Sequence, residues 1–191
     1  MTLASAQSTI GIKFQDEKMA LTKNDSVVTS FIFTEVGPFF EGIAWVNSGT
    51  LYAYVDTNGN LLTTYKFTEA GNFTGGLAVV QVDSTNYGLL NTGGEWVIPP
   101  DYTEMNIPID GIVCVNLGGK WGLFDTTGQM IKEANLKQPP IIHSRDFIVV
   151  KDGKYGVVNS KDEIVIPFRY DFISRHGELF IDGTRILIGH L

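Results

Sequence analysis

The sequence predicts an all-β fold, an array of antiparallel β-hairpin, three-stranded repeats of about 34 residues that bury one continuous apolar core. Three observations predict it: one short motif recurs at a nearly fixed spacing, an apolar run of strand length precedes each copy, and the apolar spacing of a helix is missing. Only the stretch TEMNIPIDG has a short, local helical pattern. The alternative is a propeller-like closed ring, but propeller blades usually have four strands and about 40 residues or more.

The recurring motif consists of an aromatic residue, usually a Gly, two apolar residues, Asp or Asn, and a turn. Its first residues are 35, 34 and 34 positions apart, at Tyr52, Tyr87, Trp121 and Tyr155. A period in this range is typical of stacked like units. We expect these four aromatic side chains to lie in the core.

The repeat also defines the domain organisation. We expect an N-terminal tail at residues 1–9 and a single repeat domain at residues 10–191. The motifs lie near residues 18–30, 52–64, 87–99, 121–133 and 155–167, and a terminal hairpin occupies residues 178–189. The first of these copies is degenerate, and a gapless alignment matches Leu21 with Val55.

Within a unit the elements follow in a fixed order. Residues 112–116 predict a first strand, LGGK a turn, residues 121–124 a second strand and residues 129–132 a third, because each run is short and rich in β-branched or aromatic residues. In the turn after the second strand, an Asp or Asn side chain accepts hydrogen bonds from backbone N–H groups two residues on. Gly supplies the positive φ that closes this turn.

Two further residue types in the repeat have a structural interpretation. A Gly inside a strand usually marks the close approach of another backbone or ring, so we expect an aromatic side chain of a neighbouring unit to cover the Gly of each pair. Pro follows the predicted third strand in VIPP and VIPF, where it ends the ladder. Aromatic and acidic residues then recur in the connectors FIFTEV, YKFTEA, DYTEM and YDFI.

Composition argues against several classes of protein. A net charge of −7 with 14 Lys and Arg leaves no basic stripe to neutralise phosphates, so no nucleic-acid partner is expected. Cys114 is the single cysteine, and its apolar neighbours indicate a buried, inert thiol. The segment MTLASAQSTIG has no Lys or Arg of a signal peptide, and no apolar run approaches the roughly 20 residues that cross a bilayer. We therefore expect a soluble protein without membrane insertion.

The segments KWGLFDTTG, KYGVVNSKDEIVIPFRYDFI and NYGLLNTGGEWVIPPDYTEM resemble the WG repeat family, bacterial arrays named for the Trp-Gly or Tyr-Gly pair. The resemblance covers about residues 10 to 191 and is strongest from Asn86 to Phe172. It implies a β-hairpin repeat used for binding, without a catalytic motif. Three departures are Ala53 in place of the Gly, the loss of the pair at residues 18–30, and the absence of Pro after Ile131.

Candidate catalytic and metal-binding residues are few. The histidines His143, His176 and His190 lie in no recognisable nucleophile or zinc pattern, and the Gly-rich stretches lead into strands rather than helices. The segment from Asp56 to Asn60 partly resembles a calcium loop, but its Gly is misplaced and Phe67 stands where a bidentate Glu is needed. We expect no cofactor, no metal and no enzymatic activity.

The remaining hypotheses concern surfaces. We expect a non-enzymatic scaffold that binds another protein or macromolecule, and the candidate contact residues are acidic and recur once per unit or lie on the turn edge: Glu35, Glu69, Glu104, Asp56 and Asp125. The alternative interpretation of these charges is a solvated edge that prevents strand-to-strand aggregation. A structural subunit of a larger assembly such as a virion, self-assembly through the terminal hairpins, and a glycan-binding module stay open as alternatives.

Overall fold

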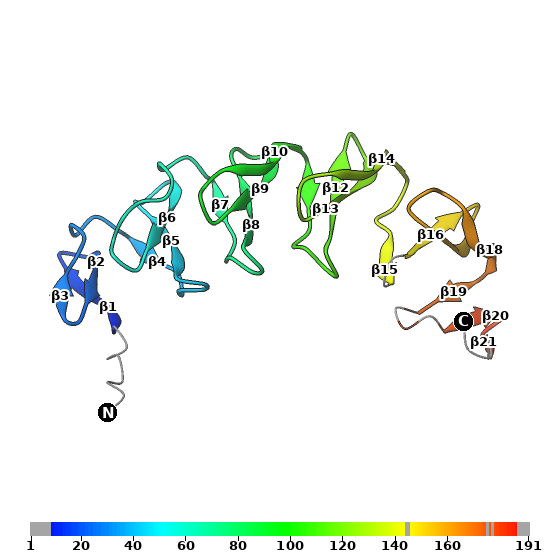
Figure 1. The fold of residues 1–191 in the computed structure, drawn as a ribbon, viewed down its shortest axis with the longest axis horizontal. Coiled ribbons are helices and arrows are strands. Elements are labelled where there is room, and N and C mark those ends of the chain that lie inside the picture. Colours follow the sequence, from blue (N-terminus) through cyan, green and yellow to red (C-terminus); the bar gives the residue numbers. More distant parts are fainter. Residues whose placement is uncertain (1–8, 144–145, 175, 177, 187–191) are drawn as a thin grey trace, which may run out of the picture. The chain divides into compact units, whose positions relative to one another are not determined.

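The structure is a computed structural model that describes residues 9–143, 146–174, 176 and 178–186. These residues contain strands and turns but no helix, and the strands form six small antiparallel sheets, none of them closed (Figure 1). The predicted all-β class and its repeated hairpins are therefore confirmed.

Each sheet follows the previous one along the chain, and we call the sheets repeats one to six. Repeat one consists of β1 (Ile10–Gln15), β2 (Lys18–Lys23) and β3 (Ser26–Val27). Repeat two consists of β4 (Glu35–Val36), β5 (Ile43–Asn47) and β6 (Tyr52–Asp56). Repeat three consists of β7 (Glu69–Ala70), β8 (Leu77–Gln81), β9 (Tyr87–Asn91) and β10 (Trp96–Tyr102). Repeat four consists of β11 (Glu104–Met105), β12 (Ile112–Leu117), β13 (Lys120–Asp125) and β14 (Met130–Leu136). Repeat five consists of β15 (Ile141–His143), β16 (Asp146–Lys151), β17 (Lys154–Val158) and β18 (Ile164–Tyr170). Repeat six consists of β19 (Phe172–Ile173), β20 (Leu179–Ile181) and β21 (Thr184–Ile186). The last residues of the predicted terminal hairpin, 187–189, lie outside the described residues.

Contacts within the chain group the repeats into two units, divided between Asp101 and Tyr102. Each unit has its own buried apolar clusters. In the first unit, one cluster joins Phe33 to Ala44 and Val46 of repeat two. In the second unit, another joins Leu123 of repeat four to residues of repeat five such as Phe147. Neighbouring repeats within a unit thus share their cores.

One position at the end of each repeat contributes most visibly to these shared cores. It pairs with the first residue of the motif, as in the bridge of Tyr52 with Phe67 and the pairing of Tyr155 with Tyr170. We call it the inter-repeat position, and its paired residues are Phe33, Phe67, Leu136 and Tyr170. Tyr102 is assigned to it by sequence, because it follows Tyr87 at the same spacing as Phe67 follows Tyr52. Phe67 is fully buried among Val80 and Leu90 of the following repeat. A repeat therefore buries this ring by means of its neighbour.

The connectors contain a short strand that the sequence analysis missed. The two-residue strands β4, β7 and β11 pair with the outer edge of the first long strand of their repeats. With β15 in the corresponding place in repeat five, repeats three, four and five have four strands rather than three. The preceding threonine supports each pairing; the backbone N–H of Thr68, for example, donates to the carbonyl of Gln81 at 2.8 Å. Two residues give no alternating pattern, which is why a connector was predicted. The strand-number argument against propeller blades was therefore wrong.

The Gly of the aromatic–Gly pair is covered differently from the prediction. Residues 133–135 of β14 stand opposite Gly122 alone, because Trp121 pairs with Leu136 and Leu123 with Lys132. This bulge brings the third strand of the same repeat onto the Gly, whereas an aromatic residue of a neighbouring unit was expected. The bulge forms because a third strand with extra residues must arch over the second.

Proline also lies elsewhere than predicted. Pro99 and Pro100 lie inside β10, and Pro167 lies inside β18 between Ile166 and Tyr170, where the register shifts. The third strand therefore continues past proline to the inter-repeat position. A bulge tolerates proline because its residues leave the ladder, so no N–H donor is required there.

Repeat one differs from its gapless alignment by one residue. Met19 exchanges backbone hydrogen bonds with Phe33, as Tyr52 does with Phe67, so Met19 and Ala20 occupy the positions of the pair that seemed lost. Accordingly Leu21 matches Tyr54 and not Val55. The difference arises because the turn from Lys23 to Ser26 is shorter than the corresponding turn of repeat two.

Neighbouring repeats are also linked by polar contacts. In the first unit, the Glu41 carboxylate accepts hydrogen bonds from the backbone N–H groups of Gly75 and Gly76 at 2.7 and 2.8 Å. In the second unit, Lys132 forms an ion pair with Asp162 of repeat five. The Lys132 side chain is 4% exposed, whereas that of Asp162 is 63% exposed. Burial lowers the pKa of Lys132.

We expect Gly122→Ala to lower the free energy of unfolding by about 1–3 kcal/mol, because the new Cβ would overpack a closely packed site. That Cβ would lie 3.0 Å from both the nitrogen of Ala134 and the carbonyl oxygen of Lys132, and neither backbone atom moves easily. Urea unfolding measures the change. Ala53→Gly is the reverse substitution at the same place in repeat two and serves as the comparison. A neutral or stabilising Gly122→Ala would show that β14 is not held against the Gly.

We expect Lys132→Ile to raise the free energy of unfolding by about 1 kcal/mol, because a buried ion pair often costs more in desolvation than it returns. Ile166 already occupies the equivalent place opposite Val157, and the freed Asp162 remains solvated. Lys132→Ala, which removes packing without replacing it, should lower stability. If Lys132→Ile instead cost more than about 1 kcal/mol, the ion pair would be a net stabilising contact between repeats.

Candidate functional site

The predicted acidic contact residues of the connectors lie on the short edge strands. Glu35, Glu69 and Glu104 are all exposed and begin β4, β7 and β11. The Tyr52 hydroxyl donates to Glu35 Oε2 and the Tyr87 hydroxyl to Glu69 Oε2, each at 3.4 Å. These long contacts orient the carboxylates without covering them. The strand geometry therefore presents one solvent-accessible carboxylate at the same place in repeats two, three and four.

The two turn aspartates have a different role. Asp56 Oδ1 accepts from the backbone N–H groups of Asn58 and Asn60, and Asp125 Oδ1 accepts from those of Thr127 and Gln129, all at 2.8–2.9 Å. Hydrogen bonds led by that of the Thr127 hydroxyl lower the pKa of Asp125. Gly128 follows with a φ of 85°, as the turn prediction required. The predicted turn chemistry is thus confirmed, and in Asp56 the second oxygen is occupied as well, since Oδ2 accepts from the Asn60 side-chain amide at 2.9 Å.

The aromatic residues that open the motif are half-buried rather than fully buried. Tyr52 packs edge-to-face on Trp45 at 5.5 Å, and Tyr155 does the same with Phe172 at 5.7 Å. They lie at the rim of the core because their partners at the inter-repeat position, such as Phe67, take the inner place. The core prediction for this position was therefore only partly right.

Cys114 is buried, as predicted, and burial raises the pKa of its thiol to about 11. It lines a cavity of about 240 Å³ between repeats four and five, together with Trp121, Pro140 and Ile142. A raised thiol pKa disfavours the nucleophilic thiolate. This cavity therefore offers apolar walls and no activated nucleophile.

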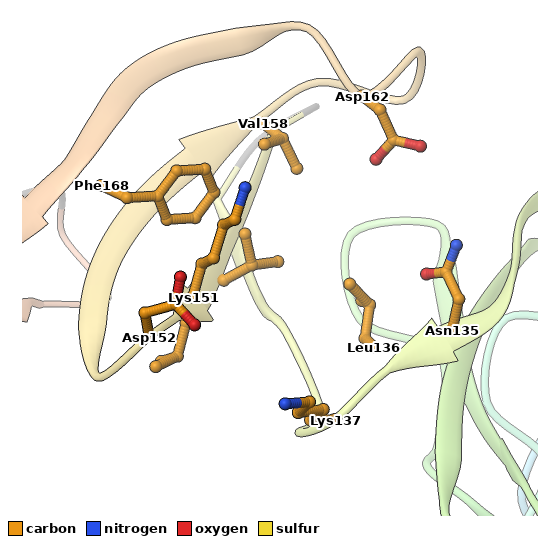
Figure 2. Close-up of a pocket in the computed structure, with 10 residues that line it drawn as sticks. Asn135, Leu136, Lys137, Lys151, Asp152, Val158, Asp162 and Phe168 are labelled. Carbon is orange, nitrogen blue, oxygen red and sulfur yellow. The ribbon is translucent and has the colours of Figure 1, made fainter.

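A second cavity, of about 230 Å³, lies between repeats four and five of the second unit. Figure 2 shows Asn135 and Leu136 of β14 on one side and Val158, Phe168 and Lys151 of repeat five on the other. Its other lining residues are Lys137, Val149, Val150, Asp152 and Asp162. The walls are mainly apolar and the rim carries charges of both signs, as in ligand sites generally.

Sequence analysis did not identify this cavity, although a signal was present. The connectors with recurring aromatic residues were noted, but the connector after β14 reads Leu136-Lys137-Gln138 and breaks the series. The break marks the place where the cavity lies. The signal is the absence of an aromatic residue at a position where the other repeats have one, and such an absence does not form a motif.

The described residues provide little for metal or acid–base chemistry. No group of three or more His, Cys, Asp or Glu residues that could hold a metal ion occurs among them. His176 is exposed, the side chain of His143 is outside the described residues, and so is His190. In the described part of the chain, no helix has the length and apolar character required to span a membrane.

Comparison with known protein families shows which family this chain belongs to. The sequence pattern of the family described as WG containing repeat matches residues 22–50, 52–85, 87–121 and 155–175, which is more than half of the chain. The chain therefore belongs to the WG repeat family, as the resemblance predicted. The match at residues 87–121 ends on Trp121, and residues 122–154, which follow from the Trp-Gly pair, are not matched.

No curated protein sequence matches the chain. Among solved structures, the chain is similar to the eukaryotic initiation factor (TM-score 0.46, 13% identity, 89% of this chain and 55% of the other). It is also similar to BamB from Moraxella catarrhalis (0.39, 13%, 85% and 61%) and to the WD40 beta propeller domain of Doa1 (0.37, 12%, 83% and 64%). The chain thus covers less than two thirds of each of these structures.

We expect Asp125→Asn to keep the turn intact and to reduce the acid sensitivity of the protein. Asn91 and Asn159 hold the same turn in repeats three and five through the same backbone hydrogen bonds. The folded pKa of Asp125 is below its ordinary value of 3.8, so its stabilising contribution is present above that value and is lost as pH falls through the folded pKa.

Thermal unfolding of the wild type, Asp125→Asn and Asp125→Ala between about pH 2 and pH 7 measures this. Asp125→Ala should lower the Tm at pH 7 by roughly 2–4 °C, a shift typical of the loss of about 1 kcal/mol from a protein of this size. An Asp125→Asn variant with the wild-type loss of Tm below pH 4 would contradict the assignment.

Proposed function

We propose that the chain is a non-enzymatic repeat scaffold that binds a protein partner through its recurring exposed carboxylates. The observation that carries the proposal is the equivalent placement of Glu35 and Glu69 on β4 and β7. A partner with a matching spacing of basic groups would meet one carboxylate in each repeat. Membership of a repeat family supports this, because arrays of like units present extended surfaces.

The support at each carboxylate comes from the backbone around it. Glu35 pairs with Asn47 and Glu69 with Gln81 at the sheet edge, and both Asn47 and Gln81 are buried. The Thr68 hydroxyl donates to Gln81 Oε1 at 2.9 Å, which fixes the strand that carries Glu69. A carboxylate on such a fixed strand loses little conformational entropy on binding, apart from that of its own side chain.

A charged edge also has the simpler role of discouraging strand-to-strand association. The two roles differ in whether the positions of the charged residues matter. Repulsion between edges depends on the number of charges, whereas a partner site depends on which positions carry them. The experiment below separates them by neutralising two acidic residues of the series or two outside it.

We expect Glu35→Gln/Glu69→Gln to weaken partner binding at least about fivefold at low salt, and the wild-type affinity to fall as salt is raised. The tagged chain is cross-linked in its native source, and the captured partner is then titrated against purified wild type and variants. Glu17→Gln/Glu133→Gln is the matched control, because both residues are exposed and lie outside the series. Equal loss in the two double variants would contradict the assignment to these edge strands. Purification as a monomer without a stoichiometric partner would contradict the scaffold itself.

A further inference from the structure

The cavity between repeats four and five has the size and walls of a small-ligand site. Its volume is about 230 Å³, and its apolar wall includes Leu136, Val149, Val158 and Phe168. An engineered apolar cavity of about 150 Å³ in another protein binds benzene. A single aromatic ring with a short substituent therefore fits this volume.

The repeat itself indicates what kind of group belongs there. Leu136 occupies the inter-repeat position, which is aromatic in the other four copies: Phe33, Phe67, Tyr102 and Tyr170. Leu136 is half-buried, as Tyr102 is, whereas Phe67 is fully buried and Tyr170 is 3% exposed. Repeat four thus reaches its neighbour with a smaller side chain than the others use.

The residue that faces this position is also smaller in repeat five than in repeat four, whereas repeats two and three have the aliphatic Val55 and Leu90 at the same place. Tyr102 packs edge-to-face against Phe124 with ring centroids 5.7 Å apart. Val158 occupies the place of Phe124, because Phe124 pairs with Met130 and Val158 with Ile164 at the same point of the two sheets. Two aromatic rings in one copy are therefore replaced by Leu136 and Val158 in the other. The cavity lies between these two side chains, as Figure 2 shows.

The charges at the cavity favour an anionic substituent. Lys137, Lys151, Asp152 and Asp162 line it, but Asp162 is paired with Lys132. Among the charged residues that line the cavity, two lysines, Lys137 and Lys151, therefore remain against one unpaired carboxylate, that of Asp152. The Lys151 ammonium lies 5.9 Å from the centroid of Phe168, so a positive charge stands over an aromatic wall beside the space for the ligand.

We propose that this cavity binds a small aromatic carboxylate. The ring takes the space that an aromatic side chain of the chain fills in other copies, and the carboxylate pairs with the Lys151 ammonium at the rim. The site is independent of the edge carboxylates, since it lies between repeats four and five and selects the opposite charge.

The test is a titration of the full chain with phenylacetate, followed by ¹H–¹⁵N spectra. We expect saturable shifts confined to the amides of residues near 136, 149–151 and 168. Leu136→Phe, which restores the ring found in the other copies, should weaken phenylacetate binding at least about tenfold by occupying the cavity, and its spectrum shows whether it folds. Lys151→Met should weaken binding roughly threefold to fivefold, the size typical of one exposed charge pair.

Two controls make the outcome decisive. Lys161→Met removes an exposed lysine that does not line the cavity, and it should leave the affinity for phenylacetate unchanged. Phenethylamine has the same ring with a positive charge, and it should bind at least about threefold more weakly than phenylacetate. Binding of phenylacetate that survives Leu136→Phe in a folded protein would overturn the site. Equal binding of phenethylamine and phenylacetate would overturn the choice of an anionic ligand.

Discussion

The burial of one ring at the boundary between repeats is the interaction on which this architecture depends. A sheet of three or four short strands cannot bury its apolar surface alone. Phe67 shows the solution, since it ends repeat two and is fully buried in a cluster that contains residues of repeats two and three. Its ring makes a tilted contact with Tyr54 and an edge-to-face contact with Trp96, at 6.0 and 6.2 Å between centroids. The stability of a repeat is therefore a property of the pair and not of the single sheet.

The aromatic–Gly pair makes this arrangement possible. For the third strand to reach the inter-repeat position, it must arch over the second strand, and the arch comes closest at Gly88, Gly122 and Gly156. At Gly88 an added Cβ would lie 2.6 Å from a ring carbon of Trp96. The pair that names the family is thus a packing requirement.

The sequence alone was sufficient for the class, the period, the long strands and the turn chemistry. Each of these depends on residues near one another in the chain, as in the Asp125 turn. The edge strand at Glu69 and the bulge opposite Gly122 were missed because they depend on pairing between segments far apart. The composition of a connector does not determine whether part of it pairs with the edge of a sheet.

One candidate site could also be predicted from the sequence, whereas the other required the structure. The exposure of Glu35, Glu69 and Glu104 followed from their place in the connectors. The cavity at Leu136 required the pairing register, because only the register shows that Leu136 stands where the other copies have a ring. A substitution of one apolar residue by another is inconspicuous in a sequence, although it changes volume considerably.

The shortened turn of repeat one indicates where this chain tolerates insertions and deletions. Lys23 and Ser26 close a tighter turn than Asp56 and Asn60 do, yet Met19 still pairs with its inter-repeat residue as Tyr52 does. The outer turn thus absorbs a missing residue without moving the boundary. The step from the inter-repeat residue to the next edge strand has the same length at Phe33 and Glu35 as at Phe67 and Glu69. A difference in the length of an outer turn therefore changes the spacing between motifs along the chain without changing the contact at the boundary.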